Sequence, residues 1–183
     1  MALKKIGVIR GVTDGKFKPV GGTEKDIRGI AAIKFNPDIV TATSEGDNDI
    51  YSLSSRVKSI KFTFEHAVLD LDTLSAITGW TLTAGGSGSS ETQTLDIDTD
   101  TFPYFSFECR STNLIDSLDT TGDTIADAHF KIYKAKITGG LNVELKDEGH
   151  WQVSFEALAI PDSSSSSKIA SIIFYETATN IKL

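Results

Sequence analysis

The sequence predicts a mainly β protein, an antiparallel β-sandwich or half-barrel with one short flanking α-helix and long loops. Apolar and polar residues alternate in three segments, which are Val57 to Val68, Tyr104 to Arg110 and Trp151 to Ile160. This alternation is typical of strands that have one face on a core and the other in water. Helix signals are clear in one segment only, and the stretches between the segments are rich in glycine, serine and aspartate, which favour turns.

The predicted strands differ in length and regularity. In the first of them Ile60, Phe62 and Phe64 share the apolar face, and in the second Phe105, Phe107 and Cys109 do so, with Ser106, Glu108 and Arg110 on the polar face. Shorter strands are expected at Ile6 to Val12, Ile30 to Phe35, Ile39 to Thr43, Thr92 to Ile97, Phe130 to Ile137, Leu141 to Leu145 and Ile169 to Glu176. The pair Gly139-Gly140 between two of these predicts a hairpin turn.

The predicted helix runs from Leu71 to Thr78. Asp70 precedes it and can accept a hydrogen bond from a backbone N–H of the first turn, and Gly79 follows it and can adopt the left-handed conformation that ends a helix. Leu71, Leu74 and Ile77 lie at helical spacing and predict an apolar stripe that packs on a sheet.

A chain of 183 residues is long enough for one sizeable domain, and no shift in composition marks a boundary. We therefore expect a single domain over residues 1–183. Within it we expect a flexible N-terminal arm at 1–26, a long loop at 44–56 and a C-terminal strand and arm at 161–183. Residues 13–29, 85–90 and 162–167 are also predicted to be loops. Loops of more than about 12 residues are uncommon in compact domains unless they have a function.

Composition excludes several classes of protein. The formal net charge of -7 argues against a protein that grips nucleic acid, because phosphate binding depends mainly on lysine and arginine. Cys109 is the single cysteine, so neither an internal disulfide nor a cysteine-based zinc site is expected. No stretch has the length and apolarity of a signal peptide or a membrane span. We expect a protein that is made and folded in a reducing cytoplasm.

The candidate catalytic side chains form no recognisable pattern. His66, His129 and His150 are scattered without metal-ligand spacing, and sheet or surface histidines are the better interpretation. Cys109 lies on the apolar face of its strand, which favours a buried, inert thiol over a nucleophile.

The acidic and glycine-rich motifs are equally weak. Asp96, Asp98 and Asp100 resemble the first half of a calcium loop, but the sixth position is Thr101 and the twelfth is Phe107, where glycine and glutamate are required. The acidic cluster Glu45, Asp47 and Asp49 is better explained as a solvated loop than as a cation site. The run from Gly85 to Ser90 lacks the lysine and the strand-to-helix setting of a phosphate loop. We predict no enzymatic activity, no cofactor and no metal.

The order of segments along the chain is more informative. A glycine-rich start leads into Asp26 to Phe35, the polar stretch Ser44 to Tyr51, the alternating strand Val57 to Val68 and the capped helix, and the strand within Gly149 to Asp162 comes late. This order resembles that of the major tail tube protein of long-tailed bacteriophages, a family related to the tube subunits of contractile injection and type VI secretion machines. The resemblance covers the chain from residue 26 to its end and depends on pattern and order.

The resemblance implies a β-sandwich flanked by one helix and assembled as hexameric rings that stack into a hollow tube. In that family four strands of each subunit form a continuous barrel around the lumen, and the loop before the lumenal strand reaches a neighbouring ring. The loop residues implied here are Glu45, Asp47, Asn48, Asp49, Ile50, Tyr51 and Leu53. The implied lumenal strands are Val57 to Val68 and Gln152 to Glu156, paired or in one sheet. Their lumen-facing residues are Ser59, Lys61, Thr63, Glu65, Gln152, Ser154 and Glu156.

The resemblance also implies partners and location. The partners are copies of this chain, other tail proteins such as the tape measure, initiator and terminator proteins, and DNA that passes without tight or sequence-specific binding. The location is the virion tail, after synthesis in the cytoplasm of the bacterial host and without membrane insertion. A channel that passes DNA needs a hydrophilic wall that is not strongly cationic, so Lys61 is expected to pair with a nearby carboxylate.

Two other classes remain open from the residues. A β-sandwich binding module for carbohydrate or a host surface needs exposed aromatic side chains, and Tyr51, Trp80 and Tyr104 are dispersed along the sequence, although Trp80 after the helix is a candidate for exposure. A small hydrolase needs a convergent polar pocket that the sequence does not indicate. Residues 79–100 have no assigned role.

Overall fold

The computed structural model describes residues 8–9, 11–27, 29–46, 49–66, 70–99, 101–111, 114–115, 126–144, 152–175 and 177–183. The protein is mainly β with antiparallel sheets and one helix in this part of the chain, as predicted. The strands are β1 (Val8–Ile9), β2 (Asp14–Pro19), β3 (Lys25–Ile27), β4 (Ile30–Gly46), β5 (Asp49–His66), β6 (Thr81–Gly85), β7 (Thr92–Asp96), β8 (Phe105–Ser111), β9 (Leu114–Ile115), β10 (Asp127–Glu144), β11 (Gln152–Ala159) and β12 (Ala170–Tyr175). The helix is α1 (Leu71–Thr78).

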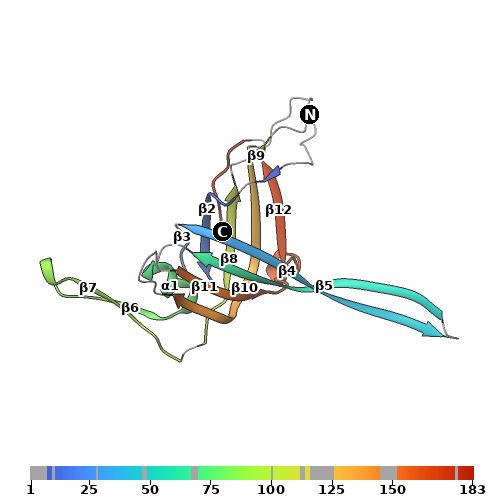
Figure 1. Ribbon diagram of the computed structural model, residues 1–183, viewed down its shortest axis with the longest axis horizontal. Helices are drawn as coiled ribbons and strands as arrows, with labels where there is room; N and C mark the ends of the chain where they lie inside the picture. The colour runs from blue at the N-terminus through green and yellow to red at the C-terminus, as the bar shows by residue number, and fades with distance from the viewer. Residues whose placement is uncertain are drawn as a thin grey trace.

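The main sheet has the strand order β3-β2-β8-β10-β11-β5-β4, and β12 pairs with the first half of β10. The long strand β10 joins two halves of a sandwich. Its first half lies between β8 and β12, and its second half continues beyond β8 and pairs with β11. Figure 1 shows β10 running through the body of the molecule with the other strands on its two sides.

Phenylalanine side chains fill the space between the two halves. Phe17 of β2 is fully buried and contacts both sides, with its ring centroid 5.0 Å from that of Phe107 in β8 and 5.5 Å from that of Phe64 in β5. Phe62 and Phe155 complete the cluster. Every one of these residues alternates with polar neighbours in the sequence, so burial of one strand face drives the packing of the sandwich.

The helix α1 is capped as predicted. The Asp70 carboxylate accepts a hydrogen bond from the N–H of Asp72, and Gly79 has a φ of 81° and donates its N–H to the Ser75 carbonyl. Ile77 is buried in the core. The helix lies beside β2 and β3, and the Thr73 hydroxyl is 3.5 Å from the Asp26 carbonyl oxygen.

The structure corrects three predictions about the flexible arm, a turn and a strand boundary. Residues 14–26, expected in a flexible arm, contain β2 and β3, and Phe17 anchors β2 in the core. Gly139-Gly140 is no hairpin turn, since β10 runs through both glycines with a shift in register to β11, and Gly140 has a φ of 63°. The strands expected separately at Ile30 to Phe35 and Ile39 to Thr43 are one strand, β4.

Two hairpins leave the body in opposite directions (Figure 1). One is the outer part of β4 and β5, and the other is β6 with β7, which pair only with each other in the described part of the chain. A two-stranded hairpin alone in water is marginally stable. In the described residues no helix is long and apolar enough to cross a membrane.

Candidate functional site

The predicted lumenal strands are neighbours in one sheet. β5 and β11 form an antiparallel ladder in which Ser154 is opposite Glu65 and Glu156 is opposite Thr63. β4 pairs with the other edge of β5, with Lys34 opposite Thr63. On the far side of β11, Asn142 of β10 is opposite Ser154. The expected pairing is therefore confirmed, and four strands in the order β10-β11-β5-β4 carry one continuous polar face.

Two ion pairs cross the strands of this polar face. Lys61 Nζ lies 2.8 Å from Glu156 Oε2, which joins β5 to β11, and Lys34 Nζ lies 3.5 Å from Glu65 Oε1, which joins β4 to β5. All four side chains are partly exposed, so both ion pairs are reached by solvent. The prediction that Lys61 has a carboxylate partner is confirmed.

The other predicted wall residues are unevenly placed. Thr63 and Ser154 are half-buried and line a groove of about 320 Å³ together with Asn142. Ser59 departs from the prediction because it is buried, with 6% of its area exposed, and its hydroxyl is 3.5 Å from Asp38 Oδ2 of β4. Gln152 lies in β11, but its side chain is outside the described residues.

Both edges of the four-stranded sheet lack a partner in the described part of the chain. β4 pairs with β5 alone. On the other edge, the pairing of β10 with β8 ends at Ala135, so residues 137–144 of β10 pair with β11 alone. Pro37 lies within β4, and proline in a strand is typical of a sheet edge because it cannot donate to a ladder.

The segment predicted as a long loop at 44–56 is a β-hairpin. β4 and β5 remain paired from Ile39 opposite Val57 to Gly46 opposite Asp49, and we call this outer part of the hairpin the arm. Asp47 and Asn48 lie outside the described residues, and Glu45, Asp49, Ile50 and Tyr51 are strand residues whose side chains are not described. Leu53 is 68% exposed. Its contact with another subunit stays a prediction.

One face of the arm carries three exposed apolar side chains. Ile39 and Val57 are directly opposite each other and are 61% and 46% exposed, and Leu53 lies four pairs further along the ladder on the same face, with the polar pair Thr41 and Ser55 between them. Ile39 follows Phe35 on the same side of β4, so this face continues the core-facing side of the sheet beyond the body. Ile39, Val57 and Lys34 are candidate interface residues that the sequence alone did not predict, although alternation along residues 30–35 indicates the face of Lys34.

Four further candidate residues are buried. Cys109 is buried, and its burial raises the pKa of the thiol to about 12. His129 is fully buried in the sheet, with Nδ1 2.6 Å from Glu108 Oε1. Glu108, predicted on the polar, solvent-facing side of its strand, is only 3% exposed. Trp80, a candidate for exposure, is buried next to Phe102.

No cluster of three histidine, cysteine or acidic side chains that could hold a metal ion occurs among the described residues. Of the aromatic residues considered for the alternative binding module, Trp80 is buried and Tyr104 is partly exposed. Tyr104 is 38% exposed, with Lys134 Nζ 4.7 Å from its ring centroid, and the Tyr51 side chain is outside the described residues. No model of a known protein family matches the chain, and no curated protein is significantly similar to it.

Proposed function

We propose that this chain is a structural subunit that assembles with copies of itself into closed rings, and that stacked rings form the hollow tail tube of a long-tailed bacteriophage through which DNA is ejected. The observation that carries the proposal is the four-stranded sheet β10-β11-β5-β4, whose two edges are unpaired in the described part of the chain. An open edge presents N–H and C=O groups to any available strand, and closure into a barrel satisfies them.

Strand direction supports closure between identical copies. The four strands alternate in direction, so β4 and β10 at the two edges run antiparallel to each other. Subunits related by rotation about a ring axis share one orientation. The β4 edge of one copy would therefore meet the β10 edge of the next as an antiparallel pair, and the alternation would continue around the ring. This contact is head-to-tail, which generates closed rings when the rotation closes.

The polarity of the two faces of the sheet determines which face lines the lumen. Phe62 and Phe64 of β5 and Phe155 of β11 point into the core, where β2 and β8 of the same chain cover them. The opposite face carries the cross-strand ion pairs and the polar residues. In a closed barrel, with the second layer of each subunit outside, this polar face becomes the inner wall.

The charges of the polar face suit the passage of DNA. Two of its lysines, Lys61 and Lys34, are each within 4 Å of a carboxylate. Phosphate binding requires free cationic side chains, so a wall of this kind would not hold the DNA backbone. We propose Lys61, Thr63, Glu65, Ser154 and Glu156 as lumen residues.

The arm supports stacking. It continues β4 and β5 in the direction of the wall strands and spans eight residues of β4, about 25 Å at the usual rise of a strand. Because wall strands are tilted from a barrel axis by less than a right angle, the arm would leave the ring at one end and lie against the next ring. Its uncovered apolar face would supply the contact area.

Electron microscopy tests the assembly. Purified protein, concentrated and left to stand, is expected to show stacked rings or hollow tubes of even diameter in negative stain. Uniform small particles at every concentration would contradict the proposal if the covalent test described next is also negative.

Engineered cysteines directly test the contact between the β4 edge of one copy and the β10 edge of the next. The native Cys109 is buried and contributes no background reaction. Asn142→Cys on the β10 edge is combined in one chain with a cysteine at Ala32, Lys34 or Asn36, which lie at successive polar-face positions of the β4 edge. Oxidation is expected to give covalent oligomers for one of the three combinations. Asn142→Cys alone is the matched control and should stay monomeric in denaturing gels. Tubes that yield no cross-link in any combination would exclude a contact between β4 of one copy and β10 of the next.

A further inference from the structure

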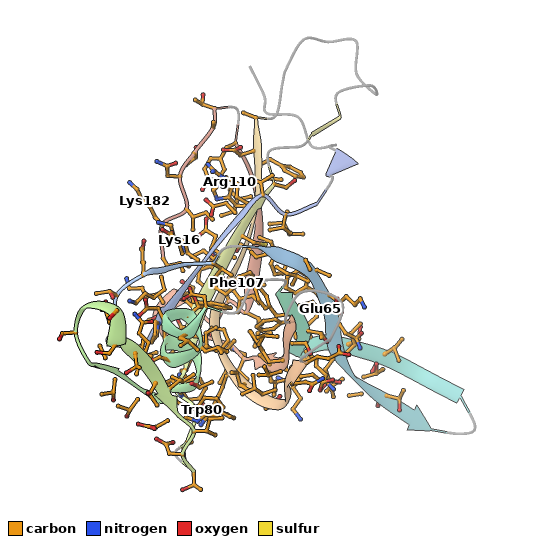
Figure 2. All side chains as sticks on the ribbon, turned by 60° about the vertical axis from the view of Figure 1, so that its left-hand side comes forward. Lys16, Glu65, Trp80, Phe107, Arg110 and Lys182 are labelled. Carbon is orange, nitrogen blue, oxygen red and sulfur yellow. The ribbon has the colours of Figure 1, made fainter. Side chains whose placement is uncertain are left out.

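The C-terminal segment 177–183, which we call the strap, lies across the outer face of β2, β8 and β10. Figure 2 shows Lys182 of the strap on the same side of the molecule as Arg110 and Lys16. Three cationic side chains donate hydrogen bonds to its main-chain oxygens. Arg110 Nη1 donates to Thr179 at 3.2 Å. Lys131 Nζ donates to Lys182 and Lys18 Nζ to Leu183, each at 2.7 Å.

Two carboxylates bind the N–H groups of the same segment. Asp127 Oδ2 accepts a hydrogen bond from the N–H of Thr179, and Glu24 Oε1 accepts one from the N–H of Leu183 at 2.9 Å. Side chains of the body thus bind both the carbonyl oxygens and the N–H groups of the strap. Such contacts recognise an extended peptide with little regard to its sequence, as in other peptide-binding grooves.

One strap side chain is recognised as well. Ile181 is buried, with 2% of its area exposed, and lies beside a groove of about 410 Å³ that Lys16, Asp26 and Ile27 also line. The Lys182 side chain is exposed. Specificity therefore resides in one branched apolar residue.

The groups that bind the strap are held by the body itself. Glu108 lies 2.6 Å from His129 Nδ1 and 3.1 Å from Lys131 Nζ, and Arg110 lies 3.4 Å from Asp14. Because these ion pairs do not involve the strap, the binding groups stay oriented when it leaves, which lowers the cost of binding another peptide. Asp127, which accepts a hydrogen bond from the N–H of Thr179, also lies 4.0 Å from His129 Nε2, and both side chains are fully buried.

We infer that the outer face of β2, β8 and β10 is a peptide-binding groove, and that its ligand class is an extended peptide with a branched apolar residue at the position of Ile181. The chain's own strap occupies the groove here. The inference goes beyond the proposed function and does not depend on ring or tube formation, so failure of either leaves the other standing.

The test supplies the strap as a separate molecule. A chain that ends at Glu176 is titrated into a fluorescein-labelled peptide of residues 177–183, and anisotropy is recorded. Saturable binding is expected. The same peptide with Ile181→Asp should bind at least tenfold more weakly, and the peptide with Lys182→Ala should bind within about twofold of the parent. A folded truncated chain that does not bind at millimolar concentration, or that binds the Ile181→Asp peptide equally well, would overturn the inference.

A second measurement decides the matter if the truncated chain does not fold. Isotope-labelled full-length protein is mixed with excess unlabelled peptide, and amide exchange is followed at Thr179 and Leu183. Displacement of the strap should speed exchange at both positions and leave the β12 amides unchanged. Unchanged exchange at saturating peptide would count against an exchangeable groove.

Discussion

The apolar face of the arm gives the sharpest test of assembly. Replacing Ile39, Leu53 and Val57 together with serine removes the apolar side chains from this face and leaves the body untouched. All three are largely uncovered, with exposed fractions of 61%, 68% and 46%. Exposed substitutions of this kind usually change the free energy of unfolding by less than about 0.5 kcal/mol. The triple variant is therefore expected to fold as a normal monomer and to lose the contact between rings.

The exposed fractions set the magnitude. Full burial of one such side chain is worth about 1.5–3 kcal/mol, so covering the exposed parts of all three on a neighbour would contribute roughly 3–5 kcal/mol per arm. Each 1.4 kcal/mol changes an association constant about tenfold. The triple variant should thus need a protein concentration higher by about two to three decades before tubes appear.

Sedimentation velocity over a concentration series measures the assembly, and thermal unfolding checks the monomer. Val20→Ser is the control for loss of an exposed apolar side chain, because Val20 is 73% exposed and lies outside the arm. The control is expected to assemble like the parent chain. Tubes from the triple variant at the parent concentration, with an intact monomer, would refute the arm as the stacking contact.

Three further predictions concern the subunit itself. Phe107→Ala should lower the free energy of unfolding by about 3–5 kcal/mol in denaturant titration, because the fully buried ring leaves a cavity, and a loss below about 1.5 kcal/mol would contradict the described packing. Cys109 should not react with a thiol reagent at pH 8 in the folded chain, because burial raises its pKa to about 12, and it should react fully in guanidinium; rapid native reaction would exclude its burial. The N–H of Leu183 lowers the pKa of Glu24 below its usual 4.5, so this attachment of the strap is present above pH 4.5 and is lost as the pH falls through the lowered pKa. The Leu183 amide shift should follow that titration, and it should not do so in Glu24→Gln.

Local signals predicted part of the fold correctly. Asp70 and Gly79 act within one turn of their helix, so sequence alone identifies both ends of α1. Strands β5, β8 and β11 have one face on the core, and burial of that face imposes the alternation that predicts them. The carboxylate partner of Lys61 was expected from the resemblance and not from a local signal, and Glu156 of β11 is that partner.

The errors arose where distant parts of the chain decide the outcome. Residues 52–56 are exposed on both faces, so they show no alternation, and they form a strand because β4 pairs with them. Gly139-Gly140 has turn composition, but the ladder to β11 continues past it with a register shift. Glu108 occupies a polar position of β8, and it is buried because β10 places His129 and Lys131 against it and the strap lies over the same face.

The ion pairs of the polar face contribute little to stability, and the proposed passage of DNA would give them a role. Lys61 and Lys34 are 52% and 76% exposed, and ion pairs at such sites contribute about 0–1 kcal/mol to folding. Their electrostatic effect is larger, because a repeated ring would multiply every unpaired lysine into a circle of cations around the lumen, and DNA affinity rises steeply with each phosphate contact. In such a ring every copy of Lys61 would be accompanied by Glu156 and every copy of Lys34 by Glu65. These carboxylates on neighbouring strands would prevent a circle of unpaired cations. If the proposed tube forms, this face would line it as a hydrophilic wall whose two described lysines are each paired with a carboxylate, as the passage of DNA requires.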